Sequence, residues 1–137
     1  MEIVQVSKRS VNILRIMLSG IFLVAGINHV LFPKHVASRL MESRVYQNLL
    51  SVFDAPTLVV VTGVGLLTGG LLLAINRYPR YAAILLLTLL IPITVSVQLQ
   101  GWHTSGPLFK NVALAGALLF FIVNKFNDKQ TKYEIKD

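Results

Sequence analysis

The sequence predicts an all-α protein, a four-helix transmembrane bundle. Of the 137 residues, 54% are apolar and only 14% are charged, and the mean hydropathy of +0.65 is far above that of a soluble domain. Four segments carry this apolar excess, each near the roughly 20 residues that a helix needs to cross hydrocarbon: residues 11–32, 57–75, 81–99 and 107–123. Their apolar runs are nearly continuous, whereas the strands of a membrane barrel alternate apolar and polar residues.

These segments leave little room for a soluble domain. We therefore expect a single membrane domain over residues 1–137 that ends in a charged cytoplasmic tail, residues 124–137. A cleaved secretory signal is the alternative for the N-terminus, because Lys8 and Arg9 precede the first apolar run. That run continues to Phe32 and has no small-x-small cleavage site followed by a soluble chain, which favours a retained helix.

The basic residues are divided unequally between the two sides of the predicted bundle. Nine of the 13 lie on the side of the termini: Lys8, Arg9, Arg15, Arg77, Arg80, Lys125, Lys129, Lys132 and Lys136. The other side has Lys34, Arg39, Arg44 and Lys110. By the positive-inside rule both termini are cytoplasmic, as an even number of spans allows. We expect a multi-pass protein of the cell (inner) membrane, whose basic residues face the lipid bilayer and not nucleic acid.

The composition excludes two kinds of chemistry. The chain has no cysteine, so it cannot by itself exchange disulfides, ligate a metal through thiolates or hold an iron–sulfur cluster. Its six acidic residues all fall outside the predicted spans. A buried carboxylate proton relay is therefore excluded.

The longest connection, residues 33–56, shows a loose amphipathic pattern. Apolar residues recur in it at steps of three to five: Val36, Leu40, Val45, Leu49 and Phe53. This predicts an interfacial helix that lies on the headgroups or caps the bundle, with a solvated loop as the alternative. Asp54 and Pro56 then indicate the start of the second span, with the carboxylate as N-cap and the proline in the first turn.

Small residues and one proline predict how the spans pack. Gly65 and Gly69 lie four residues apart, as do Ala113 and Ala117, and this spacing lets helix backbones approach closely. We expect both pairs to pack helices within the bundle, with a dimerisation face as the alternative. Pro92 removes one helical hydrogen bond of the third span and predicts a kink that opens a cavity.

The first span carries a polar face. Arg15, Ser19, Phe22, Gly26 and His29 recur at steps of four and three, which places them on one side of a helix. This side is expected to face the bundle, because lipid would penalise an arginine or an imidazole by several kcal/mol. Arg15 and Ser19 are the polar residues of the inner leaflet, and for Arg15 both snorkelling and a functional role stay open.

The predicted topology brings polar ends of three spans to one depth, the outer third of the bundle. The candidate ligand-binding residues there are Asn28, His29, Gln98, His103, Lys110 and Asn111. We predict that Lys110 and Asn111 face the interior near His29, with boundary anchoring as the alternative for Lys110. His29 and His103 are of the residue type that ligates haem, but nothing around them specifies haem, and no metal site is expected.

These residues lie within a pattern that resembles a known family. The DoxX-like family of small four-helix bacterial and archaeal membrane proteins is similar to the chain over roughly Arg15 to Phe121. The resemblance is carried, in order, by RIMLSGIFLVAGINHVLFP, GVGLLTGGLLL, RYPRYAAILLLTLL and GPLFKNVALAGALLFF. It implies a membrane subunit associated with quinone-linked sulfur oxidation or with redox-stress complexes. The thiol chemistry of related quinone-reducing bundles does not carry over, because the chain lacks cysteine.

Two hypotheses of function follow. In the first, the protein is an accessory subunit of a quinone-linked membrane redox system, with an outer-leaflet polar pocket and with membrane or outer-side redox proteins as partners. In the second, it is a non-catalytic scaffold or assembly factor whose polar residues lock the helices together. A small-molecule transporter ranks third, because no intramembrane acid and no inverted repeat supports it. Catalysis, the ligand and homo-oligomerisation stay open.

Overall fold

The structure is a computed structural model that describes residues 6–98 and 105–124. Its elements are α1 (Lys8–Leu31), α2 (Pro33–Met41), the π-helical turn η1 (Tyr46–Leu50), α3 (Ala55–Ala74), α4 (Pro79–Gln98) and α5 (Ser105–Val123). Helices α1, α3, α4 and α5 are long and apolar enough to cross a membrane, and the described ranges contain no strand. The predicted all-α bundle is confirmed, and the helices begin and end within a turn of the predicted bounds.

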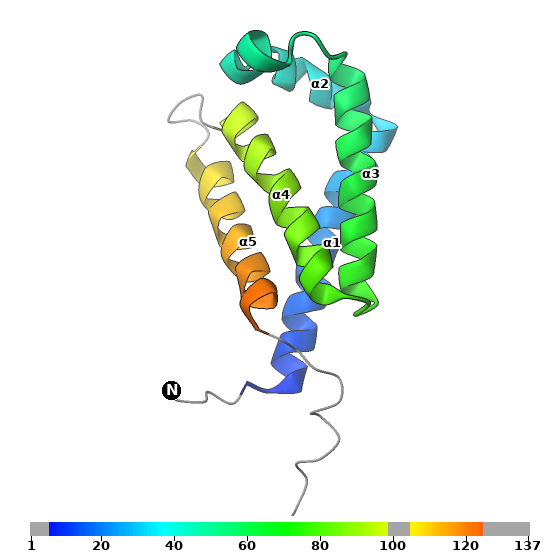
Figure 1. The fold of residues 1–137 in the computed structure, drawn as a ribbon, viewed down its shortest axis with the longest axis vertical. Helices are drawn as coiled ribbons and strands as arrows, with labels where there is room; N and C mark the ends of the chain where they lie inside the picture. Colours follow the sequence, from blue (N-terminus) through cyan, green and yellow to red (C-terminus); the bar gives the residue numbers. More distant parts are fainter. Residues whose placement is uncertain (1–5, 99–104, 125–137) are drawn as a thin grey trace, which may run out of the picture.

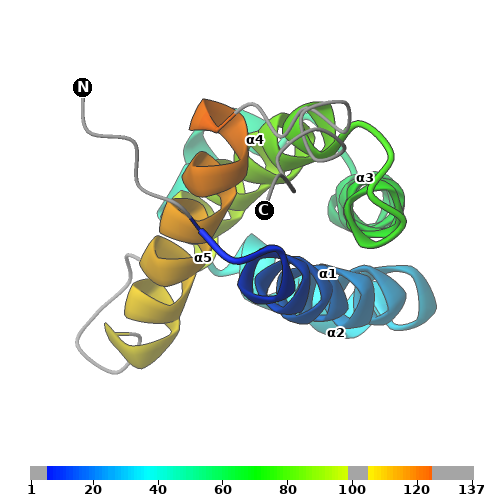
Figure 2. The same ribbon diagram turned by 90° about the horizontal axis from the view of Figure 1, so that it is seen from below.

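The four spanning helices follow the long axis of the molecule, and α2 lies across one end of them, here called the α2 end (Figure 1). The first residue of α1 and the last of α5 lie at the opposite, terminal end. Helix α1 packs closely on α3, and α4 packs on both α3 and α5, whereas α1 and α5 touch only slightly. Both views show α1 and α5 diverging toward the α2 end (Figures 1 and 2). The bundle is therefore closed at the terminal end and splayed at the α2 end.

Glycines set the close approach of α1 to α3. A Cβ atom added to Gly63 would lie 2.7 Å from the Cβ of His29 and 3.2 Å from the carbonyl oxygen of Gly26. Distances this short leave no room for a side chain, so the two backbones meet because both positions are glycine. The predicted pair Gly65 and Gly69 lies against α4 instead, where an added Cβ would come within 2.7 Å of Leu89 and Leu86, respectively.

The other predicted small-residue pair behaves differently. Ala117 is half-buried against the core, but Ala113 is exposed, so the prediction that Ala113 packs helices within the bundle is wrong. Helix α5 turns Leu114, Leu118 and Phe121 toward the core. Ala113 points elsewhere because neighbouring helical residues diverge by about 100°.

The main core fills the terminal end and the middle of the bundle. Its buried members come from all four spans: Leu18, Phe22, Leu66, Leu73, Ala82, Ala83, Leu86, Leu90, Leu114, Leu118 and Phe121. A second, smaller cluster of Ala37, Ala55 and Val59 fixes α2 to the start of α3. Of the predicted interfacial segment, residues Pro33–Met41 form a helix that caps the bundle, and the rest up to α3 consists mainly of turns and the π-helical turn η1.

Both ends of α3 are capped by polar groups. At its start, the Asp54 carboxylate accepts hydrogen bonds from the Thr57 backbone N–H at 3.0 Å and from the Thr57 hydroxyl at 2.7 Å. At its end, Asn76 has a φ of 58° and donates its N–H to Leu73, and Arg77 donates to Leu72. This is the Schellman arrangement, with asparagine in the left-handed position that glycine usually takes.

Arg15 completes the cap at the end of α3. Its Nη1 donates to the carbonyl oxygens of Leu73 and Ala74, at 3.2 and 3.1 Å, and its Nη2 donates to Asn12. Carbonyls of the last helical turn have no partner within their own helix, and they attract cations. The buried hydroxyl of Ser19 donates to the Arg15 carbonyl at 2.6 Å. The structure thus shows Arg15 holding α1 against α3, a structural contact that differs from both the snorkelling and the functional role left open for it.

Candidate functional site

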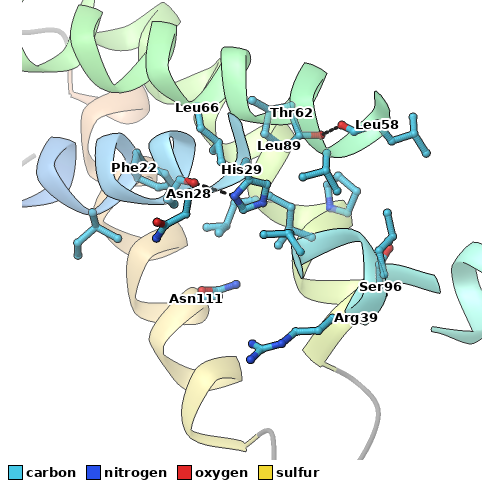
Figure 3. A pocket seen from close by; sticks show the side chains of 18 of the residues that line it. Phe22, Asn28, His29, Arg39, Leu58, Thr62, Leu66, Leu89, Ser96 and Asn111 are labelled. Atoms are coloured by element: carbon cyan, nitrogen blue, oxygen red, sulfur yellow. Dashed lines mark hydrogen bonds between the residues drawn. The ribbon is translucent and has the colours of Figure 1, made fainter. Parts of the chain in front are cut away.

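A cavity of about 980 Å³ lies between the four spans beneath α2. This volume is at the upper end of the roughly 300–1,000 Å³ of small-molecule pockets. One part of its wall is apolar and includes Phe22, Leu66, Leu89 and Ile93. The polar side chains that line it are Asn28, His29, His35, Arg39, Thr62, Ser96, Lys110 and Asn111. Figure 3 shows Asn28, His29, Arg39 and Asn111 directed toward the same space from three different helices.

His29 is half-buried, and one of its ring nitrogens is already used. Its Nδ1 lies 2.7 Å from the carbonyl oxygen of Ala25, one turn earlier in α1. Since a carbonyl only accepts, Nδ1 must carry the hydrogen and donate. In the neutral ring, Nε2 is therefore an acceptor, and within the described part of the chain no other group bonds to it. When its ring is neutral, His29 thus offers the cavity a hydrogen-bond acceptor at Nε2.

Asn111 is 5% exposed and belongs to a hydrogen-bond chain between α5 and α4. Its Nδ2 donates to the Thr94 hydroxyl at 2.9 Å, and that hydroxyl donates to the Leu90 carbonyl at 2.7 Å. Asn111 therefore faces the interior of the bundle, because it is buried and its hydrogen-bond partner Thr94 lies on the adjacent helix α4. Its direct partner is α4 and not α1, although it lines the same cavity as Asn28 and His29.

Two cations lie at the cavity, Arg39 on α2 and Lys110 on α5. Both residues are exposed as well as cavity-lining. Among the residues that the structure describes, neither has a hydrogen-bond or ion-pair partner. Within residues 6–98 and 105–124, no aspartate or glutamate lines the cavity. The polar part of the site therefore carries uncompensated positive charge.

Exposed lining residues on both α1 and α5 indicate a side opening of the cavity between these two helices. Asn28 on α1 and Lys110 on α5 both line it and are both exposed, and the two helices diverge at this level (Figure 1). Pro92 of α4, at which the sequence predicted a kink that opens a cavity, also lines this cavity.

The sequence-predicted site residues divide into three groups. Asn28, His29, Lys110 and Asn111 line one cavity. Gln98 is the last residue of α4, but its side chain lies outside the described part, as does all of His103. Arg15 and Ser19 lie toward the terminal end, in the cap of α3.

Sequence reasoning missed four polar lining residues: His35, Arg39, Thr62 and Ser96. His35 and Arg39 were assigned to an interfacial helix, and nothing in the chain specified that this helix folds back over the bundle. Thr62 lies one residue before Gly63, where α1 and α3 meet. The available signal was a hydroxyl residue beside a glycine within an otherwise apolar span.

The fold and the cavity define a multi-pass membrane protein: four apolar helices, a capping helix and a pocket that is apolar on one side and polar on the other. The DoxX family model matches residues 10–99, which is most of the chain from α1 through α4. The protein therefore belongs to the DoxX family, as the sequence resemblance indicated. No curated protein and no solved structure matched the chain.

Proposed function

We propose that the protein is an accessory subunit of a quinone-linked membrane redox system that holds a quinone-type headgroup in its α2-end cavity. The observation that carries the proposal is the lining of that cavity, which combines hydrogen-bonding side chains from all five α-helices with an apolar part of the wall. Ligand pockets commonly have this design, in which few polar groups orient a mostly apolar molecule. Membership of the DoxX family is consistent with a redox setting.

Each polar side chain can make a particular kind of hydrogen bond to such a headgroup. The amide of Asn28 and the ammonium of Lys110 can donate to a quinone oxygen, whereas the neutral His29 ring can only accept at Nε2. Its Nδ1–H donor is used by the Ala25 carbonyl. His29 therefore suits the hydroxyl of a quinol. The apolar wall and the side opening would take the isoprenoid tail.

The orientation follows from the placement of charge. The terminal end has Lys8, Arg9, Arg15, Arg77 and Arg80, and the α2 end has fewer basic residues. By the positive-inside rule the terminal end is cytoplasmic and the α2 end faces outward in the inner membrane. The cavity then lies in the outer leaflet, where it would meet an outer-side redox partner.

A pair of neighbouring residues on α1 provides the test. Ala25 lines the cavity, while Val24 is 61% exposed on the lipid side. The protein is placed in phosphatidylcholine nanodiscs, and binding of decylubiquinone and its quinol is measured by native mass spectrometry. Ala25→Phe should abolish binding because the phenyl ring occupies the cavity, and Val24→Phe should leave it unchanged.

A second pair of variants, on α4, controls for the case in which a variant of the first pair misfolds. Ile93→Phe fills the same cavity from α4, and its control Ile91→Phe changes a side chain that is 55% exposed. Equal binding by cavity-filling and control variants that unfold at similar temperatures would contradict the proposal.

One observation favours the scaffold hypothesis for a single residue. The buried chain from Asn111 through Thr94 to Leu90 joins α5 to α4 without any ligand. If purified protein retains no small molecule by mass spectrometry and neither quinone form binds, this structural role would extend to the whole polar cluster. The protein would then act as a membrane scaffold.

A further inference from the structure

We infer that the α2-end cavity selects amphiphiles whose headgroup is an oxyanion, a carboxylate or a phosphate, through Arg39 and Lys110. The inference rests on the proposed function, in that it takes the cavity to be a ligand site. It narrows the ligand class from a hydrogen-bonding headgroup to a negatively charged one. It is independent of any redox reaction.

The charges around the cavity carry the argument. Arg39 enters from α2 and Lys110 from α5, so two different elements each bring one cation to the same space. In Figure 3 the guanidinium of Arg39 extends along the cavity on the side of Asn111. Two like charges at the mouth of one cavity repel each other, and an anion between them would relieve that repulsion.

No carboxylate of the described α2 end supplies that anion. Asp54 is already used, because its carboxylate caps α3 through Thr57. Glu42 is exposed, and neither acid lines the cavity. An arginine fork and an ammonium both suit carboxylate and phosphate oxygens, and the fork adds geometric selectivity.

The same residues explain why the ligand should be an amphiphile and not a free ion. The cations lie at the mouth of the cavity, where they are exposed, while Phe22 and Leu66 on the opposite wall are buried. A charged headgroup can stay at the interface with its apolar chain against this wall. The side opening between α1 and α5 gives the chain access from the bilayer.

The test compares three probes on the whole protein in phosphatidylcholine nanodiscs. Dodecyl phosphate supplies the oxyanion on a single chain, and dodecanol is its neutral match. Phosphatidylglycerol added to the nanodisc tests whether a bilayer lipid headgroup serves as the source. Binding is measured by native mass spectrometry at low and high ionic strength, with decylubiquinone as a competitor.

Variants that each remove one positive charge distinguish binding at the cavity from general attraction to the charged surface. Arg39→Gln and Lys110→Gln should each weaken dodecyl phosphate binding about three- to tenfold, the range expected for losing one partly exposed charge-assisted contact. Lys34→Gln and Arg44→Gln remove cations of the same end that do not line the cavity, and they should leave binding unchanged. High salt should weaken dodecyl phosphate binding and not dodecanol binding.

Each outcome decides the matter. Preferential binding of dodecyl phosphate that depends on Arg39 and Lys110 supports the inference, and displacement by phosphatidylglycerol would identify a bilayer lipid as the source. Equal losses in all four variants would show only surface attraction and overturn it. Binding of decylubiquinone without any preference for the oxyanion would overturn the inference and leave the proposed function standing. Failure of every probe would overturn both.

Discussion

The two ends of the bundle treat their polar side chains in opposite ways. At the terminal end, the Arg15 guanidinium bonds to the carbonyls of Leu73 and Ala74, and the Ser19 hydroxyl bonds to a carbonyl of its own helix. At the α2 end, Arg39 and Lys110 have no partner within the described residues, and His29 keeps a free acceptor. At the terminal end Arg15 holds two helices together, whereas the α2 end leaves Arg39, Lys110 and the Nε2 acceptor of His29 available.

Packing follows the same division. Leu73, Leu86, Leu118 and Phe121 are among the largest fully buried side chains, and they belong to the terminal-end halves of their helices. The α2 end has a small core of alanines and one valine under α2, beside the cavity. Stability and binding are therefore expected to respond to substitutions at different ends of the molecule.

The largest expected difference between the two ends is the loss of stability when one apolar side chain is truncated at each of them. Phe121 is 1% exposed in the main core, so Phe121→Ala should lower the free energy of unfolding by about 3 kcal/mol, the low end for such truncations. Ile93→Ala only enlarges a cavity that already exists and should cost less than about 1 kcal/mol. Unfolding in detergent, followed by circular dichroism, gives both values. Equal losses would show that the α2 end is packed as tightly as the terminal end.

A second substitution tests whether Arg15 fastens α1 to α3. Arg15→Met keeps the length of the side chain and removes the donors to Leu73 and Ala74, so we expect a loss of about 2 kcal/mol. The control Arg9→Met removes an exposed cation from the same end and should change the free energy of unfolding by less than about 0.5 kcal/mol. Equal effects of the two variants would assign Arg15 to the lipid headgroups.

The third prediction concerns a polar contact at the α2 end that joins two helices, the hydrogen bond from Asn111 to Thr94. A double-mutant cycle of Asn111→Leu and Thr94→Val measures their coupling. We expect about 0.6 kcal/mol, the average for hydrogen bonds between membrane helices. A coupling near zero would mean that Asn111 belongs with the ligand-binding groups, and a much larger one would favour the scaffold hypothesis.

The sequence predicted the fold well because the bilayer restricts the choice. Apolar runs of the right length admit helices and little else, and Asp54 with Pro56 placed the start of α3 correctly. The helix partners were harder to predict. Gly65 and Gly69 drew notice through their spacing, yet the contact between α1 and α3 is made by Gly26 and Gly63, which lie on different helices and share no local pattern.

The site was predicted only in part, for a similar reason. Residues inside spans have a depth that topology fixes, which is why Asn28, His29 and Asn111 were grouped correctly around one cavity. Arg39 lies on a connecting helix, and its approach to the cavity depends on how Ala37 packs on Ala55 and Val59. No sequence pattern encodes that contact. The direction of the His29 hydrogen bond likewise required the distance to Ala25.

The smallest predicted effect lies at the junction of α2 and α3, where Asp54 caps α3. The Thr57 hydroxyl, and after it the Thr57 backbone N–H, donates to the carboxylate and holds the pKa of Asp54 below its ordinary value. A lowered pKa in the folded state means that the cap contributes its full stability above the unfolded-state pKa. That contribution is lost as the pH falls through the folded-state pKa. Asp54→Ala should therefore lower the unfolding midpoint slightly at neutral pH and have no effect in strong acid, well below pH 4.

The control for this prediction is Asp54→Ser, because serine also accepts the Thr57 N–H at an N-cap but does not titrate in this range. The serine variant should keep most of the neutral-pH midpoint and lose its pH dependence relative to the unmodified protein. Unfolding scans in detergent between neutral pH and pH 2 distinguish the variants. An Asp54→Ala effect that stays constant across this range would show that the carboxylate charge is not what stabilises the start of α3. In that case, the junction that places Arg39 over the cavity would depend on the packing of Ala37, Ala55 and Val59 alone.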